Sequence, residues 1–277
     1  KNYRLDGQDN IKDPVGMQGV RLEVDTHIVT AATPNLRNLD TVLDKSHVVA
    51  NHHTVTSLAA AEAVLNRQQK ESGTLLLDIG AGTTNMVVIE DGEVQHVAVI
   101  PVGGINVTND LAIGLKTDLD IAEQVKIKHA TLEKKPVKTF VRVEHEGRSH
   151  QFDGAEIQMI AEARIEELLE LVDKELKKIH KSRKLPGGVV IVGGSANLPG
   201  IAEFTKDRLE LSARVGKLQP LTGLMDTVQD SSYVGAVGLM LLDMLLMPSS
   251  SGQSYVSGKP NNAVFGAVEG LLKRFRK

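Results

Sequence analysis

Residues 75–88 place a glycine-rich turn between two apolar strands, and no other part of the chain constrains the fold as strongly. The segment reads LLLDIGAGTTNMVV, so the first strand delivers Asp78 directly into the turn. Two glycines let backbone N–H groups converge on an anion, and Thr83 and Thr84 add hydroxyl donors. Asp78 suits Mg²⁺, which keeps much of its hydration shell and binds through carboxylates and water. The turn is predicted to hold a phosphate and a metal ion, although for one isolated Gly-x-Gly an ordinary tight hairpin is the better explanation.

A second glycine loop makes the ligand-binding interpretation stronger. Gly193-Gly194-Ser195 follows the apolar run 189–192 and precedes a helical pattern that opens near Ile201. Ligands of open α/β sheets bind at such strand-to-helix loops, and glycines can lie flat against an adenine or a ribose. Two such loops in one chain suggest a nucleotide held between two halves of a domain.

Between the two loops, Glu123 and Lys126 stand three residues apart in a helical pattern, so they share one face. A carboxylate and an ammonium group there would suit a ribose hydroxyl and a base. Taken alone, the pair is better interpreted as a solvated ion pair.

Composition narrows the function classes. The 277 residues are 41% hydrophobic, which is enough for a real core, but only 3% aromatic, so that core must be aliphatic. A net charge of −3 does not indicate a general nucleic-acid surface. The absence of cysteine excludes disulfides, thiolate zinc sites and a cysteine nucleophile. His47, His52 and His53 match no known metal-ligand spacing. The longest apolar stretch, 236–247, is too short to span a membrane.

Hydrophobic periodicity predicts alternating strands and helices. We expect a half-buried strand over 21–30, a short strand over 48–50 and a meander of three antiparallel strands between residues 75 and 100. A hairpin is expected around Gly147, and a further strand over 189–192. The predicted helices cover 36–43, 55–69, 106–114, 118–129, 155–184, 201 onward and 230–247.

Taken together, these motifs resemble the actin/Hsp70/sugar-kinase ATPase superfamily, and within it the FtsA family of bacterial cell-division proteins. Residues 78–84 are similar to the second phosphate motif of the superfamily, and residues 190–196 to its adenosine motif. Residues 57–65 and 234–242 resemble the two connecting helices, rich in small residues, that cross at the hinge. The stretches that resemble FtsA more than the wider superfamily are 11–22, 101–110 and 122–128.

This resemblance implies an actin-like (ribonuclease H-like) α/β fold of two lobes, with the remnant of an insert subdomain and a C-terminal amphipathic helix. The implied domains are the end of the insert subdomain (1–26), the first lobe (27–72 and 231–247), the second, nucleotide-binding lobe (73–113 and 186–230), a small peptide-binding subdomain (114–185), a flexible linker (248–262) and a membrane-targeting helix (263–277). The family's first phosphate loop would precede the insert, and no second Asp-x-Gly-Thr loop stands before Asp78. We therefore expect an N-terminal truncation that removes half of the phosphate grip.

The resemblance also implies ATP and Mg²⁺ as cofactors and assigns site residues. Those residues are Asp78 for the metal, Gly80, Gly82, Thr83 and Thr84 for the phosphates, Glu123 and Lys126 for the ribose and base, and Gly193, Gly194 and Ser195 for the adenosine. Many ATPases of the superfamily carry a second aspartate where Asn85 stands. Because asparagine cannot act as a base, we expect nucleotide binding with at most slow hydrolysis, and we assign no catalytic residue.

The last fifteen residues, 263–277, predict a basic amphipathic helix after a Ser/Gly/Pro-rich linker. Its apolar stripe and basic end are typical of an anchor on an anionic membrane surface. The residues expected at the membrane are Phe265, Val268, Leu271, Leu272, Lys273, Arg274, Phe275, Arg276 and Lys277. A helix docked on its own domain is the alternative, and the linker argues against it.

The implied function is that of an actin-like protein that polymerises and ties the tubulin-like protein FtsZ to the cytoplasmic face of the inner membrane at the division septum. The implied partners are the C-terminal peptide of FtsZ, with Arg164 as a contact residue, further copies of the chain in a filament, and the anionic membrane; nucleic acid is not among them. Two alternatives stay open: a pilus-assembly platform protein of the FtsA-like type, and a sugar or acetate kinase of the same superfamily.

Overall fold

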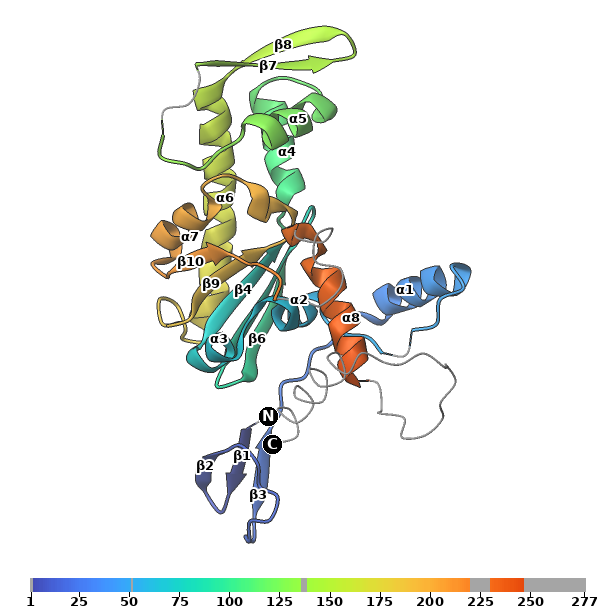
Figure 1. Ribbon diagram of the computed structural model, residues 1–277, viewed down its shortest axis with the longest axis vertical. Coiled ribbons are helices and arrows are strands. Elements are labelled where there is room, and N and C mark those ends of the chain that lie inside the picture. Colours follow the sequence, from blue (N-terminus) through green and yellow to red (C-terminus); the bar gives the residue numbers. More distant parts are fainter. Residues whose placement is uncertain (1, 51, 136–138, 220–229, 247–277) are drawn as a thin grey trace, which may run out of the picture.

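The computed structural model describes residues 2–50, 52–135, 139–219 and 230–246, and a mixed β-sheet forms the centre of this part of the chain (Figure 1). Its strands run in the order β10-β9-β4-β5-β6. They are β4 (Thr74–Ile79), β5 (Thr84–Glu90), β6 (Glu93–Ile100), β9 (Gly188–Val192) and β10 (Ala213–Val215). β4, β5 and β6 form the predicted antiparallel meander, whereas β9 and β10 add parallel to β4.

The two faces of the sheet are buried against different helices, and β4 shows why. Leu75, Leu77 and Ile79 point to one face, while Leu76 points to the other, as the period of two in a strand requires. All four side chains are at most 1% exposed, so the strand is covered on both sides. Such a strand is a near-continuous apolar run, which is the pattern that the sequence has there.

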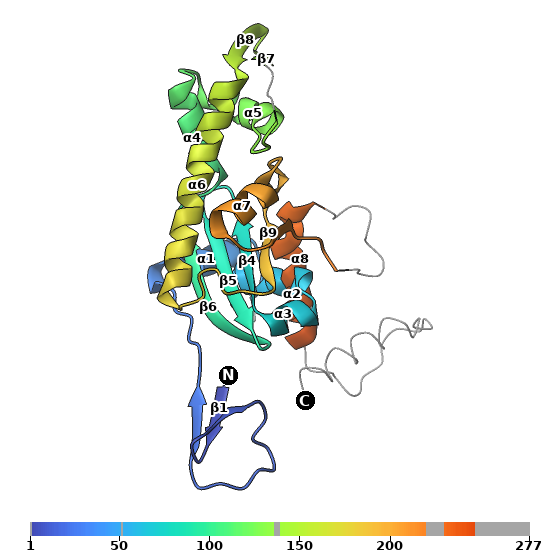
Figure 2. The ribbon, with the colours of Figure 1, turned by 90° about the vertical axis from the view of Figure 1, so that its left-hand side faces the viewer.

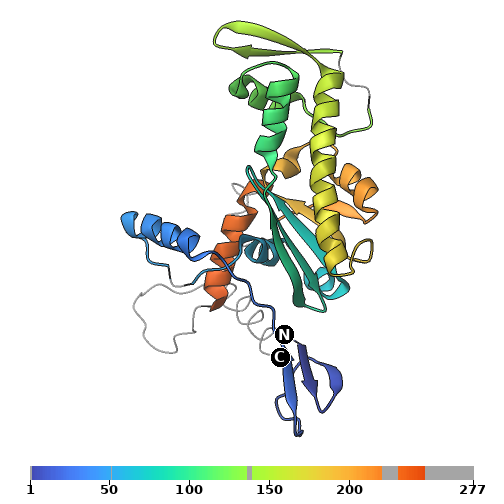
Figure 3. The same cartoon turned by 180° about the vertical axis from the view of Figure 1, so that it is seen from behind.

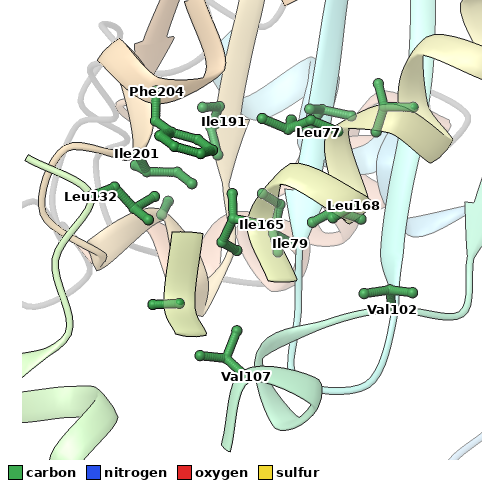
Figure 4. Close-up of a cluster of buried hydrophobic side chains, with 14 of the residues drawn as sticks. Leu77, Ile79, Val102, Val107, Leu132, Ile165, Leu168, Ile191, Ile201 and Phe204 are labelled. Atoms are coloured by element: carbon green, nitrogen blue, oxygen red, sulfur yellow. The ribbon is translucent and has the colours of Figure 1, made fainter. Parts of the chain in front are cut away.

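The long helix α6 (Gly154–Lys178) covers the first face (Figure 2). Its N-cap Asp153 accepts a hydrogen bond from the backbone N–H of Ala155 at 2.8 Å. Its buried residues recur at helical spacing, and Ile165 and Leu168 meet Leu77 and Ile79 of the sheet (Figure 4). This cluster is almost entirely aliphatic, as the composition predicts, with Phe204 of helix α7 (Ile201–Leu209) as its aromatic member.

The second face is covered by α2 (Thr56–Val64) and α8 (Val234–Leu246), which pack against each other (Figure 3). Their approach is so close that a Cβ atom built on Gly238 would lie 2.0 Å from the backbone oxygen of Ala59. Small residues on both helices permit this crossing, which confirms that residues 57–65 and 234–242 meet.

A small antiparallel sheet of β1 (Asn2–Leu5), β2 (Gln8–Ile11) and β3 (Leu22–Asp25) lies beyond one end of the central sheet (Figure 1). The strand predicted over 21–30 is thus shorter than expected, and it is mostly exposed instead of half-buried. Helix α1 (Thr33–Lys45) extends the predicted helix at both ends. The strand predicted over 48–50 is wrong: these residues form no strand, and Val49 is 87% exposed.

Other boundaries also differ from the prediction for local reasons. The helix predicted over 55–69 is two helices, because Asn66 caps a new one, α3 (Arg67–Ser72), through a reciprocal capping box with Gln69. α6 ends at Lys178 instead of 184. In the segment that follows, His180 and Arg183 take positive φ values of 58° and 60°, which do not continue a right-handed helix. α4 (Gly104–Gly114), α5 (Leu119–His129) and the hairpin of β7 (Phe140–His145) with β8 (Arg148–Asp153) follow the prediction closely.

α4, α5 and the β7–β8 hairpin stand beside the N-terminal half of α6, beyond the end of the central sheet (Figure 1). Within the described ranges, no helix is long and apolar enough to cross a membrane. The predicted linker and terminal helix, 248–277, fall outside the residues that the structure describes.

Candidate nucleotide-binding site

The turn between β4 and β5 is closed by a hydrogen bond from the N–H of Gly80 to the carbonyl of Thr83, at 2.9 Å. Gly82 and Thr83 are exposed, so they remain available to a phosphate. Thr84 is different: its side chain is fully buried and its hydroxyl donates to the carbonyl of Val102 at 2.8 Å. The proton of this hydroxyl is already used inside the fold, so Thr84 supports the turn and Thr83 is the candidate phosphate donor.

The first turn of α4 holds the glycine turn in place. The N–H groups of Gly104 and Ile105 donate to the carbonyls of Gly80 and Ala81, at 2.9 and 2.8 Å. A Cβ atom on Gly103 would lie 2.6 Å from the carbonyl oxygen of Ala81, so this approach requires a glycine. The N-terminal N–H groups of α4 are therefore directed at the loop backbone.

The second glycine loop begins directly beside Asp78. Gly193 has φ +88° and ψ 174°, a conformation that is essentially restricted to glycine. A Cβ atom there would lie 2.6 Å from both Oδ1 of Asp78 and the carbonyl oxygen of Ile79. The parallel pairing of β9 with β4, which places Val192 opposite Asp78, brings the two loops together.

Asp78 is half-buried, and burial raises the pKa of its carboxyl group. Among the described residues it has no hydrogen-bond or ion-pair partner. A carboxylate in this condition gains from a cation, and one carboxylate completed by water and phosphate oxygens fits Mg²⁺. The described residues contain no cluster of three metal-binding side chains that would suit an all-protein site. Asn85 is paired with Asp78 across β4 and β5, so its amide lies on the same face of the sheet.

Glu123 and Lys126 form a hydrogen-bonded network and not an isolated surface pair. Lys126 Nζ donates to Glu123 Oε2 at 2.6 Å, to Thr108 Oγ1 at 2.9 Å and to the carbonyl of Gly104 at 3.1 Å. Thr108 also donates to Glu123 Oε2, at 2.5 Å. Burial raises the pKa of Glu123, but the bonds from Lys126 and Thr108 outweigh it, so the pKa lies below its usual value.

Gly104 is the point at which the separate parts of the site meet. Its N–H contacts the glycine turn at Gly80, and its carbonyl accepts from Lys126. A Cβ atom on Gly104 would lie 3.0 Å from Oγ of Ser195, in the second loop. The structure therefore brings together, around the first turn of α4, the residues predicted for phosphate, metal, nucleoside and adenosine, which come from three separate stretches of sequence.

The second loop is also hydrogen-bonded to the short 3₁₀ helix Ser231–Tyr233, which directly precedes α8. The N–H of Gly193 donates to the carbonyl of Ser231 at 3.0 Å, and the Ser231 hydroxyl donates back to the carbonyl of Gly193 at 3.1 Å. Asn197 donates to Asp230 at 3.3 Å. A change in the conformation of this loop can therefore be transmitted through these hydrogen bonds to α8 and to its partner α2.

Arg164 lies away from this network, on α6. Its guanidinium contacts both oxygens of Asp110 on α4, at 2.5 and 2.9 Å, and Glu167 at 2.6 Å. This two-point ion pair with Asp110 links α4 to α6 and raises the pKa of Arg164. Any contact of Arg164 with a partner would have to compete with Asp110. The residues predicted to bind membrane, 263–277, lie outside the described residues.

Gly103, Gly104 and Thr108 are site residues that the sequence reasoning did not assign. A signal was present, because a Gly-Gly pair opens the helical pattern and Thr108 stands four residues after Gly104, on the same face.

With this geometry established, comparison with known proteins decides the family. The family model "Cell division protein FtsA" matches residues 75–238, and "SHS2 domain inserted in FTSA" matches residues 1–30. The chain belongs to the FtsA family. FtsA of Pseudomonas aeruginosa is 32% identical over 273 residues, which cover 95% of this chain and 66% of the relative. FtsA of Bacillus subtilis is 35% identical, with 87% and 54% covered. The chain thus spans between about half and two thirds of the length of these FtsA relatives.

Solved structures show that the fold is actin-like. MreB5 of Spiroplasma citri bound to ADP matches with a TM-score of 0.62 at 18% identity, over 77% of this chain and 66% of that one. The MamK double helical filament matches with a TM-score of 0.60 at 16% identity, over 77% and 65%. The family and the actin-like α/β fold expected from the resemblance are confirmed, whereas the expected C-terminal amphipathic helix lies outside the described residues.

Proposed function

We propose that this FtsA-family chain binds Mg²⁺-ATP between its two glycine loops and uses the nucleotide in assembly of an actin-like filament. The observation that carries the proposal is the convergence of Gly193 on Asp78, beside the turn that begins at Gly80. MreB5, which adopts the same fold, is bound to ADP in its solved structure, and this supports a nucleotide here.

Each part of the site has a role that its contacts suit. Gly82 and Thr83 would bind phosphate oxygens, and Gly80, whose N–H is bonded to the carbonyl of Thr83, would hold the turn in shape. Gly193, Gly194 and Ser195 would lie against the adenosine. Glu123 would contact the ribose, and Lys126, whose three N–H donors are engaged by Glu123, Thr108 and Gly104, would hold Glu123 in place. Asp78 would hold Mg²⁺, which neutralises phosphate charge when it is bound. Asn85 adds no negative charge and no base next to Asp78, which favours binding with slow hydrolysis.

Asp78→Asn tests the metal role, because its effect on the free energy of unfolding should have one sign without ligand and the opposite sign with Mg²⁺-ATP. Without nucleotide and metal, the variant should be more stable than the wild type at neutral pH. The raised pKa of Asp78 means that its favourable contribution to stability is complete below the ordinary value of 3.8 and is lost as pH rises through the higher folded-state value. With Mg²⁺-ATP the wild type should be the more stable of the two, since the variant should bind Mg²⁺-ATP about tenfold more weakly or worse.

Urea unfolding at several pH values, with and without Mg²⁺-ATP, measures both effects. Asp91→Asn is the matched control, because Asp91 is exposed at the far end of β5 and asparagine tolerates its φ of 55°. Equal Mg²⁺-dependent ATP binding by Asp78→Asn and the wild type would refute the metal role.

The wider function that we propose is that of a tether: the chain assembles into filaments and links FtsZ to the cytoplasmic face of the inner membrane at the division septum. Family membership supports the division role, and the actin-like fold that it shares with the MamK filament supports self-assembly. The basic amphipathic pattern of residues 263–277 supports the membrane contact. In this proposal residues 114–185 form the peptide-binding subdomain, beside the two lobes and the insert subdomain given above.

Co-sedimentation of FtsZ with anionic vesicles tests the tether in one experiment. FtsZ should pellet with the vesicles only when the intact protein is present, and deletion of 263–277 should remove this effect. Vesicles without anionic lipid are the control. FtsZ that pellets equally with the deletion variant would contradict the anchor.

A pilus-assembly platform is the second candidate that shares this fold. The PilM-PilN type IV pilus biogenesis complex matches with a TM-score of 0.54 at 19% identity, which shows the fold alone. The FtsA family models favour the division role, and they also argue against a sugar or acetate kinase.

A further inference from the structure

Thr108 joins the two charged residues of the candidate nucleoside site. Its side chain is buried, with 4% exposed, on the inward face of α4. A threonine hydroxyl has one proton to donate and two lone pairs to accept. The hydroxyl lies 2.5 Å from Glu123 Oε2 and 3.2 Å from the carbonyl oxygen of Gly104, and the shorter contact, to a charged acceptor, takes the proton. One lone pair accepts from Lys126 Nζ at 2.9 Å. The carbonyl of Gly104 is then left to Lys126.

This arrangement fixes which carboxylate oxygen of Glu123 remains available. Both Thr108 and Lys126 donate to Oε2, while Oε1 has no hydrogen-bond partner among the described residues. The side chain of Glu123 is 44% exposed, so it would be free to rotate without such a support. Held at Oε2 by two donors, the carboxylate presents Oε1 as a fixed acceptor.

Thr108 also connects this acceptor to the phosphate side of the site. It lies one helical turn after Gly104, whose N–H holds the glycine turn at Gly80. The distance between Glu123 and the phosphate turn is therefore set through α4. An acceptor at a fixed distance from a phosphate-binding turn suits a hydroxyl group of a nucleotide sugar.

We propose that Thr108 is a positioning residue that gives the site its preference for ribonucleotides over 2′-deoxyribonucleotides, by holding Glu123 so that Oε1 accepts from a ribose hydroxyl. This inference rests on the proposed nucleotide-binding function and deepens it. Thr108 acts through Glu123 and does not itself contact the ligand.

The test compares binding of ATP and 2′-deoxy-ATP, each with Mg²⁺, to the intact protein by calorimetry. The wild type should prefer ATP, and Thr108→Val should reduce this preference by about three- to tenfold, which corresponds to the net contribution of a typical intramolecular hydrogen bond. Thr108→Ser keeps the hydroxyl and should retain the preference. Glu123→Gln should lose it, and adding Thr108→Val to Glu123→Gln should change nothing further.

Thr205→Val is the matched control. Thr205 is equally buried, on α7, but its hydroxyl has no hydrogen-bond partner among the described residues, so this variant should leave the preference unchanged. Thr108→Ala serves if the valine variant does not fold.

Three results would overturn the inference. A preference unchanged in Thr108→Val, or equal weakening of ATP and 2′-deoxy-ATP as a merely structural residue would give, refutes it while leaving nucleotide binding intact. Failure of the wild type to bind ATP at all refutes the proposed function as well, so the two failures are distinguishable.

Discussion

Replacing Gly193 with alanine is expected to abolish nucleotide binding and to lower the free energy of unfolding by about 3 kcal/mol or more. The backbone there adopts φ +88° and ψ 174°, and this region alone costs a non-glycine residue about 1–3 kcal/mol. The added methyl group would also lie 2.6 Å from Asp78 Oδ1 and from the carbonyl of Ile79. Neither the central strand nor the candidate metal ligand can move without disturbing the site.

Gly194→Ala is the control for this prediction. Gly194 is the next residue in the same loop, is exposed, and has no atom within 4 Å of a built Cβ. Urea unfolding should show a large loss of stability for Gly193→Ala and little change for Gly194→Ala, and titration with a fluorescent ATP analogue should show no binding by Gly193→Ala. Equal free energies of unfolding for the two variants would mean that the close approach of Gly193 to Asp78 does not constrain the fold.

Gly238→Ala is expected to destabilise the protein by about 1–3 kcal/mol, as overpacking does. In an ordinary helix the same substitution is stabilising by about 1 kcal/mol, so a net loss of stability here would come from the steric clash. The new methyl group would lie 2.0 Å from the backbone oxygen of Ala59, which forces α2 and α8 apart. Because α8 directly follows the short 3₁₀ helix whose Ser231 holds Gly193, we also expect weaker nucleotide binding.

Gly235→Ala on the same helix is the matched comparison. Its methyl group would meet only Cγ2 of Thr56, at 2.8 Å, and a side-chain end can move. Thermal unfolding should therefore show a smaller loss for this variant than for Gly238→Ala. Equal stability of the Gly238→Ala variant and the wild type would show that the two helices separate without resistance.

Local pattern was sufficient for much of the fold. The apolar runs on both sides of Asp78 predicted the antiparallel strands, because a strand covered on both faces must be apolar throughout. The stripe of α6 predicted a long helix, since its buried residues recur at a period of 3.6. Capping explains one error: Asn66 and Gln69 start a new helix where the periodicity alone continued the old one.

Other features had no local signal. β10 has three residues and exists because it pairs with β9. Residues 48–50 have strand-forming side chains, yet no partner strand pairs with them among the described residues. The boundary of α6 moved because its last predicted turn adopts left-handed conformations instead.

The sequence by itself determined the candidate residues, since glycines, Asp78, Glu123 and Lys126 are residue types suited to phosphate, metal and sugar groups. Only the tertiary structure decided how they are used. In the fold, the Thr84 hydroxyl bonds to the carbonyl of Val102, the Arg164 guanidinium to Asp110, and the Thr108 hydroxyl to Glu123. Each of these contacts joins residues at least 15 positions apart. A hydrogen bond depends on distances of a few tenths of an ångström, which only the packing of α4, α5 and α6 against the sheet can set.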